Sequence, residues 1–301
     1  MARSLAERLG FSSEDCVAVV HCDDLGMCHA ANLGAYEALD HGPASSGSVM
    51  VPCPWFQEAA DMARARPEVD LGVHLTLTAE WPHYRWGPVA GASAVPSLLD
   101  DQGYLPRTAA ETARRARPEE ATREMRAQIE RALAAGIDVT HLDAHMGTAF
   151  LAPFIDGYVE LALEFALPVL AVRPTPAMLA MLGDADAGRT IAAGIERLER
   201  AGVPIFDGLD ADSLSFAPGA GEAHNRARLD AIAGAPGVHY LICHPARGGE
   251  ELDAIAPEAH ARDFERRFYG GAAGRRAIEE RGIRTVGMRA LRDLLRDGAG
   301  A

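Results

Sequence analysis

Two adjacent carboxylates follow the first apolar run of the chain. Val17 to Val20 form that run, and Asp23 and Asp24 come shortly after it. Like charges repel and aspartate is a poor strand former, so the pair either caps a turn that ends a strand or belongs to a chemical site. A divalent cation would remove the repulsion, because hard cations prefer carboxylate oxygens. Neighbouring side chains diverge, so one carboxylate would bind the ion and the other would accept a proton.

Further histidines and acids stand in or directly after later apolar runs. The segment 139–145 alternates, so that His141, Asp143 and His145 share one side of a strand. Burying three ionisable groups on one face is costly unless they are paired or bind a metal. The other candidates in or at the ends of apolar runs are His74, Arg173 and His244. Taken singly, each of these has an equally simple interpretation as a surface group or a satisfied core group.

The apolar runs and the helical patterns between them indicate the elements that position these residues. Strands are predicted at 17–20, 48–51, 69–77, 139–142, 168–172, 203–206, 238–243 and 283–286. Helices are predicted at 30–39, 56–65, 118–135, 154–166, 191–200, 226–232, 275–280 and 289–296. This alternation predicts an α/β fold with a parallel sheet, and its length fits a distorted (β/α) TIM-like barrel, with a doubly wound open sheet as the alternative.

The candidate residues gather at one place in either fold. Barrels and open parallel sheets build their sites at the carboxyl ends of the strands, which is where the acids and histidines fall. Histidine and aspartate ligands with open positions are typical of a metal that activates water. Residues 78–117 are rich in Pro, Gly and Trp and lack periodicity, although 108–117 has a helical composition. We therefore expect one domain over residues 1–301, with an inserted, lid-like loop after the third strand.

Composition excludes several classes of function. The chain has 29 Lys and Arg against 43 Asp and Glu, a net charge of −14, which disfavours nucleic acid and anionic membranes as partners. It has no apolar run of about 18 residues, no secretory signal and no close pair among its five cysteines, so we expect a cytoplasmic protein without disulfides. The absence of GxSxG, GxxxxGK[ST] and GxGxxG after the first strand disfavours a serine hydrolase, a P-loop protein and a Rossmann fold.

Four motifs in order resemble the YdjC-like carbohydrate deacetylases, a family that includes diacetylchitooligosaccharide and hopanoid-type deacetylases. They are DDLG at 23–26, GVHLTLT at 72–78, THLDAH at 140–145 and CHP at 243–245. The resemblance implies a distorted barrel and one divalent metal ion, Mg²⁺ or Zn²⁺. It implies a hydrolase in which metal-activated water attacks the acetamide carbonyl and removes an N-acetyl group from an amino sugar.

The resemblance also implies roles for individual residues. It makes Asp24, His74 and His145 the metal ligands and Asp23 the general base. His244 would be the general acid, and Arg173 would lie near the base or the substrate. The residues expected to contact the substrate are Trp81, Tyr84, Trp86 and Asp143, although the three aromatic residues could instead pin their own loop. The chain departs from the family at Cys22, Gly147, Ala149 and Ala246, where the family often has alanine, two histidines and glycine.

Other functions stay open at this point. A second kind of barrel metal hydrolase, an amidohydrolase or a phosphoesterase, would use similar ligands at the strand ends. A non-catalytic sugar-binding barrel would keep the site residues but would not convert the bound sugar. The expected partner is a small N-acetylated sugar or oligosaccharide. A homodimer is compatible with the sequence, which does not require one.

Overall fold

A central parallel sheet organises the molecule. The computed structural model describes residues 3–175, 178 and 184–298. The strands run in the order β4-β3-β2-β1-β6-β5, and β7 pairs with β1. They are β1 (Cys16–Leu25), β2 (Ser46–Val49), β3 (Leu71–Leu75), β4 (Val139–Ala144), β5 (Gly208–Asp210), β6 (Gly237–Cys243) and β7 (Arg284–Thr285). Each of these pairings is parallel, so the carboxyl ends of the strands meet along one edge.

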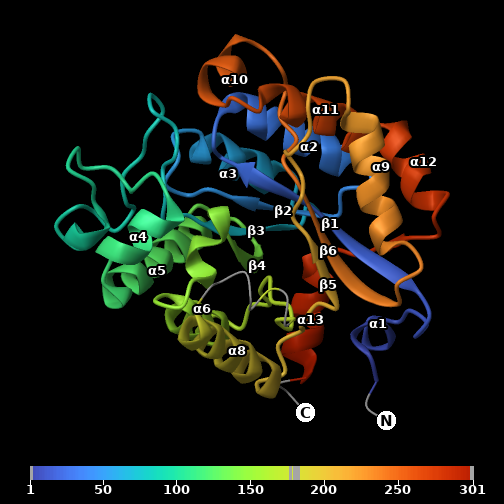
Figure 1. Cartoon of the computed structure of the whole chain (residues 1–301), viewed down its shortest axis with the longest axis horizontal. Helices are drawn as coiled ribbons and strands as arrows, with labels where there is room; N and C mark the ends of the chain where they lie inside the picture. Colours follow the sequence, from blue (N-terminus) through green and yellow to red (C-terminus); the bar gives the residue numbers. More distant parts are fainter. Residues whose placement is uncertain (1–2, 176–177, 179–183, 299–301) are drawn as a thin grey trace.

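Helices cover the outside of the sheet. In Figure 1, α2, α3 and α11 lie above the sheet, α5 lies to its left, and α6 and α8 lie below it. The described α-helices are α1 (Leu5–Arg8), α2 (His29–His41), α3 (Phe56–Ala65), α4 (Ala109–Arg115), α5 (Pro118–Ala134), α6 (Ile155–Glu164), α8 (Ala185–Arg200), α9 (Gly221–Ile232), α10 (Glu250–Ile255), α11 (Ala259–Tyr269), α12 (Ala272–Glu279) and α13 (Met288–Gly298). Two 3-10 turns, η1 (Pro96–Leu98) and η2 (His145–Phe150), complete the described elements. No described helix combines the length and the apolar character that a membrane span requires.

Two of the predicted strands do not form as regular strands. The segments 168–172 and 203–206 contribute only isolated bridges, Leu142 to Val169 and Val172 to Phe206. Both segments contain proline, which has no N–H to donate to a ladder, and this interrupts the pairing. The predicted last strand, 283–286, shortens to the two residues of β7. Among the described residues, the predicted helices form close to the expected bounds, although α8 and α9 begin earlier than expected.

The sheet is curled rather than flat. The bridge to Val169 extends it beyond β4, and the bridge to Phe206 leads on to β5, which pairs with β6. The chain therefore has an α/β fold whose parallel sheet curls into a half-barrel, which is consistent with a distorted barrel. This curvature gives the sheet a concave side that can hold residues from several strands.

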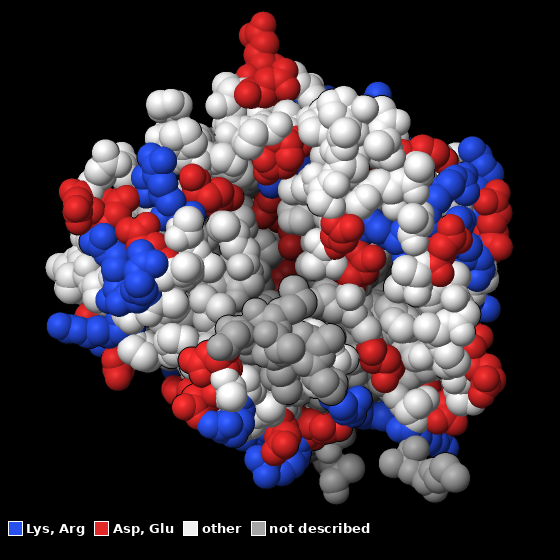
Figure 2. All heavy atoms as spheres, in the orientation of Figure 1, with Lys and Arg blue, Asp and Glu red and all other residues white. Residues whose placement is uncertain are grey.

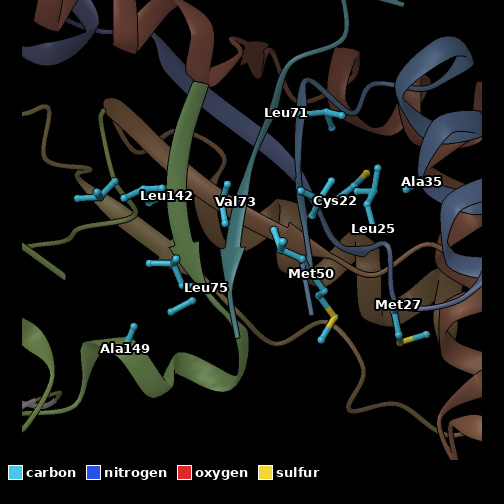
Figure 3. Packing of buried hydrophobic residues seen from close by; sticks show 14 of the residues in the cluster. Cys22, Leu25, Met27, Ala35, Met50, Leu71, Val73, Leu75, Leu142 and Ala149 are labelled. Atoms are coloured by element: carbon cyan, nitrogen blue, oxygen red, sulfur yellow. The ribbon is translucent and has the colours of Figure 1, made fainter. Parts of the chain in front are cut away.

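Strand β1 shows how the concave side is filled. Its ten residues are all buried, as expected for a central parallel strand. Ala18, Val20 and Cys22 belong to the cluster under the outer helices, and Figure 3 shows Cys22 directed toward the helix of Ala35. Val17 and Val19 belong instead to a second cluster with side chains of β6 and α13. Alternation continues this second face toward the carboxyl end of β1, where ionisable residues replace valine.

A long segment separates β3 from α5. Residues 76–117 contain only η1 and α4, and α4 matches the helical part expected at 108–117. Polar anchors hold this segment: the Trp86 indole donates to the Thr78 carbonyl, and Glu124 of α5 accepts backbone N–H groups of Val89 and Ala90. The segment is thus fastened to the elements that carry the carboxyl-end residues. The five cysteines are free and buried.

Candidate active site

A bulge at the end of β1 turns two neighbouring carboxylates toward the same point. The pairing of β1 with β2 shifts register between Cys22 and Leu25, and Asp24 has a left-handed backbone with φ 67°. In a regular strand Asp23 and Asp24 would point to opposite faces, whereas a bulge re-aims a side chain. As a result, His74 Nε2 lies 3.7 Å from Asp23 Oδ2 and 3.4 Å from Asp24 Oδ1. Strained backbone of this kind is typical of functional sites.

His145 approaches the same carboxylate from β4. It follows the last residue of β4, and the next two residues, Met146 and Gly147, both have positive φ. The turn places His145 Nδ1 3.3 Å from Asp24 Oδ1. Its Nε2 lies 3.0 Å from Glu80 Oε2. Glu80 was not a predicted site residue, although its position just after the motif of the third strand is a signal that could have pointed to it.

The residues around Asp24 fit a divalent metal ion. Asp24 Oδ1 is buried and accepts no hydrogen bond, and it is the one such carboxylate oxygen in the part of the chain that the structure describes. Its separations of 3.4 Å and 3.3 Å from His74 and His145 match two ligands in a tetrahedral shell, which lie about 3.4 Å apart when each is about 2.1 Å from the ion. His74 Nδ1 is held 3.0 Å from Asp143 Oδ1, which leaves Nε2 for an ion.

Two overlapping groups are weaker metal candidates. The atoms of His21, His141 and Asp143 also lie within 4.8 Å of one another, as do those of Asp23, His74 and Asp143. In both groups, however, the acids and imidazoles already bind each other. The two Nε2 atoms of His21 and His141, for example, are 2.8 Å apart, which is a hydrogen bond with no room for an ion. The set of Asp24, His74 and His145 therefore has the best donor arrangement.

Arg262 completes the surroundings of Asp24. It is buried on α11, and its NH1 lies 2.7 Å from Asp24 Oδ2, so the other carboxylate oxygen faces the histidines. Burial would raise the pKa of Asp24, but the Arg262 guanidinium, together with His145 and His74, outweighs it and holds the pKa well below its usual range. Sequence reasoning missed this residue and the helix that carries it, because Arg262 and Glu265 stand among the apolar residues of the buried face of α11.

The carboxylates around His74 and His145 favour the charged forms of both imidazoles when no metal is present. Burial opposes the imidazolium of His145, but Glu80 and Asp24 raise its pKa to about 9. For His74, burial is likewise outweighed by Asp143 and Asp23, so its pKa is well above the usual value. Because the site protonates both imidazoles, it holds excess negative charge. A divalent cation would neutralise this charge in place of the two protons.

His244 lies on the other side of Asp23. Its Nε2 is 3.8 Å from Asp23 Oδ2, and its Nδ1 is 2.8 Å from the Ser213 hydroxyl. Ser213 in turn donates to Glu265, whose carboxylate also accepts the backbone N–H of His244. Burial lowers the pKa of His244 to about 4, even though Asp24 and Asp23 favour its charged form. No sequence pattern indicated Ser213 or Glu265, because both come from segments without a recognised motif.

The three aromatic residues expected to contact the sugar differ in their exposure. Trp81 and Trp86 are 5% and 3% exposed and pack edge to face, so their rings are largely covered. Tyr84 is half-buried, and its hydroxyl donates to the Met27 carbonyl. Trp86 lies beside His145, and Arg262 lies over Trp81. The three aromatic residues therefore form a wall behind the Asp–His cluster, which is the loop-pinning arrangement that the sequence left open.

Asp143 and Arg173 differ in their relation to the cluster. Asp143 is 1% exposed and binds His74, Ser48 and Tyr240, so it holds the imidazole of His74 in place. Arg173 has a side chain that is 58% exposed and pairs with Glu199 at 2.5 Å. Among the described residues, no hydrogen bond or ion pair joins Arg173 to the cluster. The structure thus brings together Asp23, Asp24, His74, Asp143, His145 and His244, and sets Arg173 apart.

The surface around the site carries both signs of charge. Figure 2 shows arginines interspersed with Asp and Glu over the visible face, without a large basic area. It also shows acidic atoms in a hollow near the centre of this face. A hollow lined by acid suits an uncharged or cationic ligand better than a polyanion.

Comparison with known proteins agrees with the arrangement of these motifs. The family model for YdjC-like protein matches residues 17–280. The chain belongs to the YdjC-like family. This YdjC-like protein is 42% identical to a carbohydrate deacetylase of Thermus thermophilus, over 54% of the chain and 56% of that relative. It is 26% identical to a carbohydrate deacetylase of Thermoanaerobacter pseudethanolicus, over 83% of the chain and 89% of that relative. The first of these matches therefore spans only about half the length of the relative.

A solved structure shares the fold of the YdjC-like protein. It comes from Enterococcus faecalis V583, where it is described as a candidate cellobiose-phosphate cleavage protein. The TM-score is 0.76 at 24% identity, over 92% of this chain and 99% of the other. At that identity the likeness extends to the fold alone.

Proposed function

We propose that this YdjC-like protein is a metal-dependent hydrolase that removes an N-acetyl group from an amino sugar. The observation that carries the proposal is the buried, unpartnered Asp24 Oδ1 between two histidine nitrogens, with Asp23 and His244 beside it. The names of the Thermus and Thermoanaerobacter relatives support a carbohydrate as the substrate. The acidic hollow supports a neutral sugar over a phosphorylated one.

Asp24, His74 and His145 would hold one divalent ion. Two imidazoles and one carboxylate are typical of catalytic Zn²⁺, and Mg²⁺ is the alternative. When bound, the ion would lower the pKa of a water molecule and polarise the acetamide carbonyl. Arg262 and Asp143 would orient the ligands, since each binds the atom of Asp24 or His74 that faces away from the ion.

Asp23 is the proposed general base. Its Oδ1 is fixed 2.6 Å from His21 Nδ1, which leaves Oδ2 toward His74 and His244. A carboxylate held by one oxygen can accept the proton of the attacking water with the other. His244 is neutral near pH 7 because burial lowers its pKa to about 4, so it would receive that proton before delivering it to the amine. Asp23 Oδ2 and His244 Nε2 are 3.8 Å apart, which is beyond direct hydrogen-bond reach, so the proton would pass between them through the substrate or one water molecule.

The substrate contacts belong to the same proposal. Of the three aromatic residues expected to contact the sugar, Tyr84 is the one that retains partial exposure, so it is the best candidate among them. Trp81 and Trp86 would shape the wall behind it. Asp143 would act through His74 rather than on the sugar. The exposed pair of Arg173 with Glu199 gives Arg173 no step in this mechanism.

The test is acetate release from a panel of N-acetylated sugars after chelation and metal add-back. Asp24→Asn and His145→Ala should lose bound metal and activity together, whereas Asp23→Asn should retain metal and lose turnover. Asp101→Asn is a matched control, because the Asp101 side chain is 95% exposed and should tolerate the same change.

Other outcomes would overturn the proposal. Full metal occupancy in His145→Ala would remove the ligand assignment. Acetate release that survives chelation would exclude metal dependence. Turnover of phosphate esters or cyclic amides, but not of N-acetyl sugars, would favour another barrel hydrolase. Sugar binding without release of acetate would favour a non-catalytic protein.

A further inference from the structure

Two buried polar residues hold the ring of His244 at the nitrogen that does not face Asp23. His244 Nδ1 lies 2.8 Å from the Ser213 hydroxyl, and that hydroxyl lies 2.7 Å from Glu265 Oε2. Ser213 and Glu265 are both buried, so neither is exposed to a sugar in the site. The other ring nitrogen, Nε2, lies 3.8 Å from Asp23 Oδ2. The proposed acid is therefore held at one nitrogen and directs the other toward the proposed base.

The donors around Glu265 make it a hydrogen-bond acceptor. Its Oε2 accepts the backbone N–H of His244 at 2.7 Å, and its Oε1 accepts NH1 of Arg228 at 3.1 Å. A backbone amide and a guanidinium only donate, so the direction of both hydrogen bonds is fixed by the groups themselves. Burial raises the pKa of Glu265 to about 7, and Arg228 and the His244 N–H oppose this effect. Glu265 is therefore mainly a carboxylate above pH 7.

Arg228 is anchored independently of Glu265. It is buried on α9, and its Nε donates to Asp210 Oδ1 of β5 at 2.8 Å. Its NH2 donates to the backbone carbonyl of Ile242 in β6, two residues before His244. Buried charges are costly unless they are paired and hydrogen-bonded, and these contacts satisfy the guanidinium. Arg228 thus fixes Glu265 relative to the strand that carries the proposed acid.

Helix α11 supports both halves of the site. Arg262 and Glu265 are three residues apart, a spacing that places them on one face of the helix, and both are buried there. Arg262 donates to Asp24 Oδ2, whereas Glu265 accepts the backbone N–H of His244. The two charged residues on the buried face of α11 therefore hold the proposed metal ligand Asp24 and the proposed acid, respectively.

The single proton of the Ser213 hydroxyl determines the tautomer of His244. The hydroxyl oxygen lies 2.9 Å and 2.7 Å from the two oxygens of Glu265. Because a carboxylate only accepts, the Ser213 O–H donates to Glu265. The Ser213 oxygen can then only accept at His244 Nδ1, so Nδ1 carries the proton of the neutral ring. Nε2 is left with a free lone pair toward Asp23.

This tautomer suits the proton transfer in the proposed function. Asp23 takes a proton from the attacking water, and His244 Nε2 receives it through the substrate or one water molecule. The ring is then an imidazolium, and it becomes neutral again when the Nε2–H bond breaks and the proton passes to the departing amine. While the ring is charged, its Nδ1–H points at the Ser213 oxygen, with the Glu265 carboxylate behind it. That arrangement stabilises the charge that develops during the reaction.

We propose that Ser213 and Glu265 are positioning residues that keep His244 in the Nδ1–H tautomer and stabilise the imidazolium that forms when Nε2 takes up a proton. Arg228 fixes Glu265 for this task. The proposal rests on the proposed function, in which His244 receives and delivers the proton. None of the three supporting residues touches the reacting atoms.

Kinetics separate this role from bulk structure. Ser213→Ala removes only the hydroxyl, and it should lower kcat for acetate release by about 10- to 100-fold at about pH 8, because a hydrogen bond to a group that becomes charged is lost. KM and metal content should stay near the wild-type values. Ser46→Ala is the matched control, because Ser46 is also buried and its hydroxyl also contacts a carboxylate, that of Asp70, but at the start of β2. Its kcat should equal that of the wild type.

Imidazole ¹⁵N NMR of the Zn²⁺-loaded protein provides a readout that does not depend on activity. At about pH 8, wild-type His244 should be protonated at Nδ1 and not at Nε2, with its signals assigned by their loss in His244→Gln. Ser213→Ala should populate the Nε2–H form, because Nδ1 has lost its acceptor. Glu265→Gln should do the same, because the amide NH₂ donates to Ser213 and frees the hydroxyl proton for Nδ1.

Three results would overturn the proposal. One is a wild-type His244 protonated at Nε2, a measurement that remains decisive if Ser213→Ala does not fold. The others are equal kcat for Ser213→Ala and Ser46→Ala, and a Glu265→Gln variant that keeps the wild-type tautomer. If the wild type releases no acetate but shows the Nδ1–H tautomer that Ser213→Ala lacks, the proposed function fails while the positioning of His244 by Ser213 is supported.

Discussion

Replacing Arg262 by Met should destabilise the metal-free protein through one identifiable charge. The guanidinium NH1 lies 2.7 Å from Asp24 Oδ2, and both residues are buried, at 3% and 1% exposure. Methionine keeps an unbranched apolar stem but removes the guanidinium, with its positive charge and its place over the Trp81 ring. The variant therefore leaves the Asp24 carboxylate in the interior without its strongest partner.

The size of the effect follows from the burial of the pair. Removing one partner of a buried ion pair costs about 3–5 kcal/mol, far above the value of about 1 kcal/mol for a surface pair. His145 and His74 lie 3.3 Å and 3.4 Å from Asp24 Oδ1 and compensate part of the charge, so we expect the lower end, about 3 kcal/mol. Because Arg262 depresses the pKa of Asp24, the deficit should be complete above the ordinary carboxyl pKa of about 3.9 and should shrink as the pH falls below it.

The assay is urea unfolding at pH 7 with a chelator, followed by tryptophan fluorescence. A double-mutant cycle with Asp24→Asn isolates the pair, because the double variant contains neither charge. We expect the double variant to be less destabilised than the sum of the single variants, with a coupling of about 2 kcal/mol or more. An Arg262→Met variant within about 1 kcal/mol of the wild type, or an additive cycle, would refute the role given to this ion pair.

Two further predictions concern the aromatic wall and the metal ligands. Trp86→Ala should lower the free energy of unfolding by about 3–5 kcal/mol, because the ring is 3% exposed. At a temperature where the variant is folded, its KM should stay near the wild-type value. Unchanged stability with a tenfold higher KM would instead make Trp86 a sugar contact. Metal binding should release at least one proton near pH 7, because the pKa of His145 is about 9 without metal and the ion needs the neutral ring. Apparent affinity should therefore rise at least about tenfold per pH unit between pH 7 and 9. Calorimetry in buffers of different ionisation enthalpy should show the proton release, and buffer-independent heats would contradict it.

Local patterns were sufficient for much of the fold. The apolar run at 17–20, which became part of β1, is continuous, and continuous apolar runs bounded by polar residues are typical of buried parallel strands. The segment of β4 instead alternates between apolar and polar residues, which also indicates a strand. The helices with a clear apolar face, such as α3 and α5, were also predictable. Proline prevented 168–172 and 203–206 from forming regular strands. Helix α11 escaped prediction because Arg262 and Glu265 occupy its buried face.

The sequence by itself determined which residue types stand at the carboxyl ends of the strands. Asp24, His74 and His145 each follow or end an apolar run, and parallel pairing brings such ends together whatever the details of the sheet. The alternation of 139–145 likewise put His141, Asp143 and His145 on one side. These inferences needed only local periodicity and the rule that strands in this class run parallel.

The tertiary structure decided how these side chains meet. The register shift against β2 turns Asp24 into a left-handed conformation, which no local pattern shows. Arg262 reaches Asp24 across 238 residues of sequence, and His141 reaches His21 across 120. The exposure of Arg173 and the burial of Trp86 were equally undetermined by periodicity. Contacts of this kind depend on how the curled sheet brings distant segments together, and an individual segment does not encode that geometry.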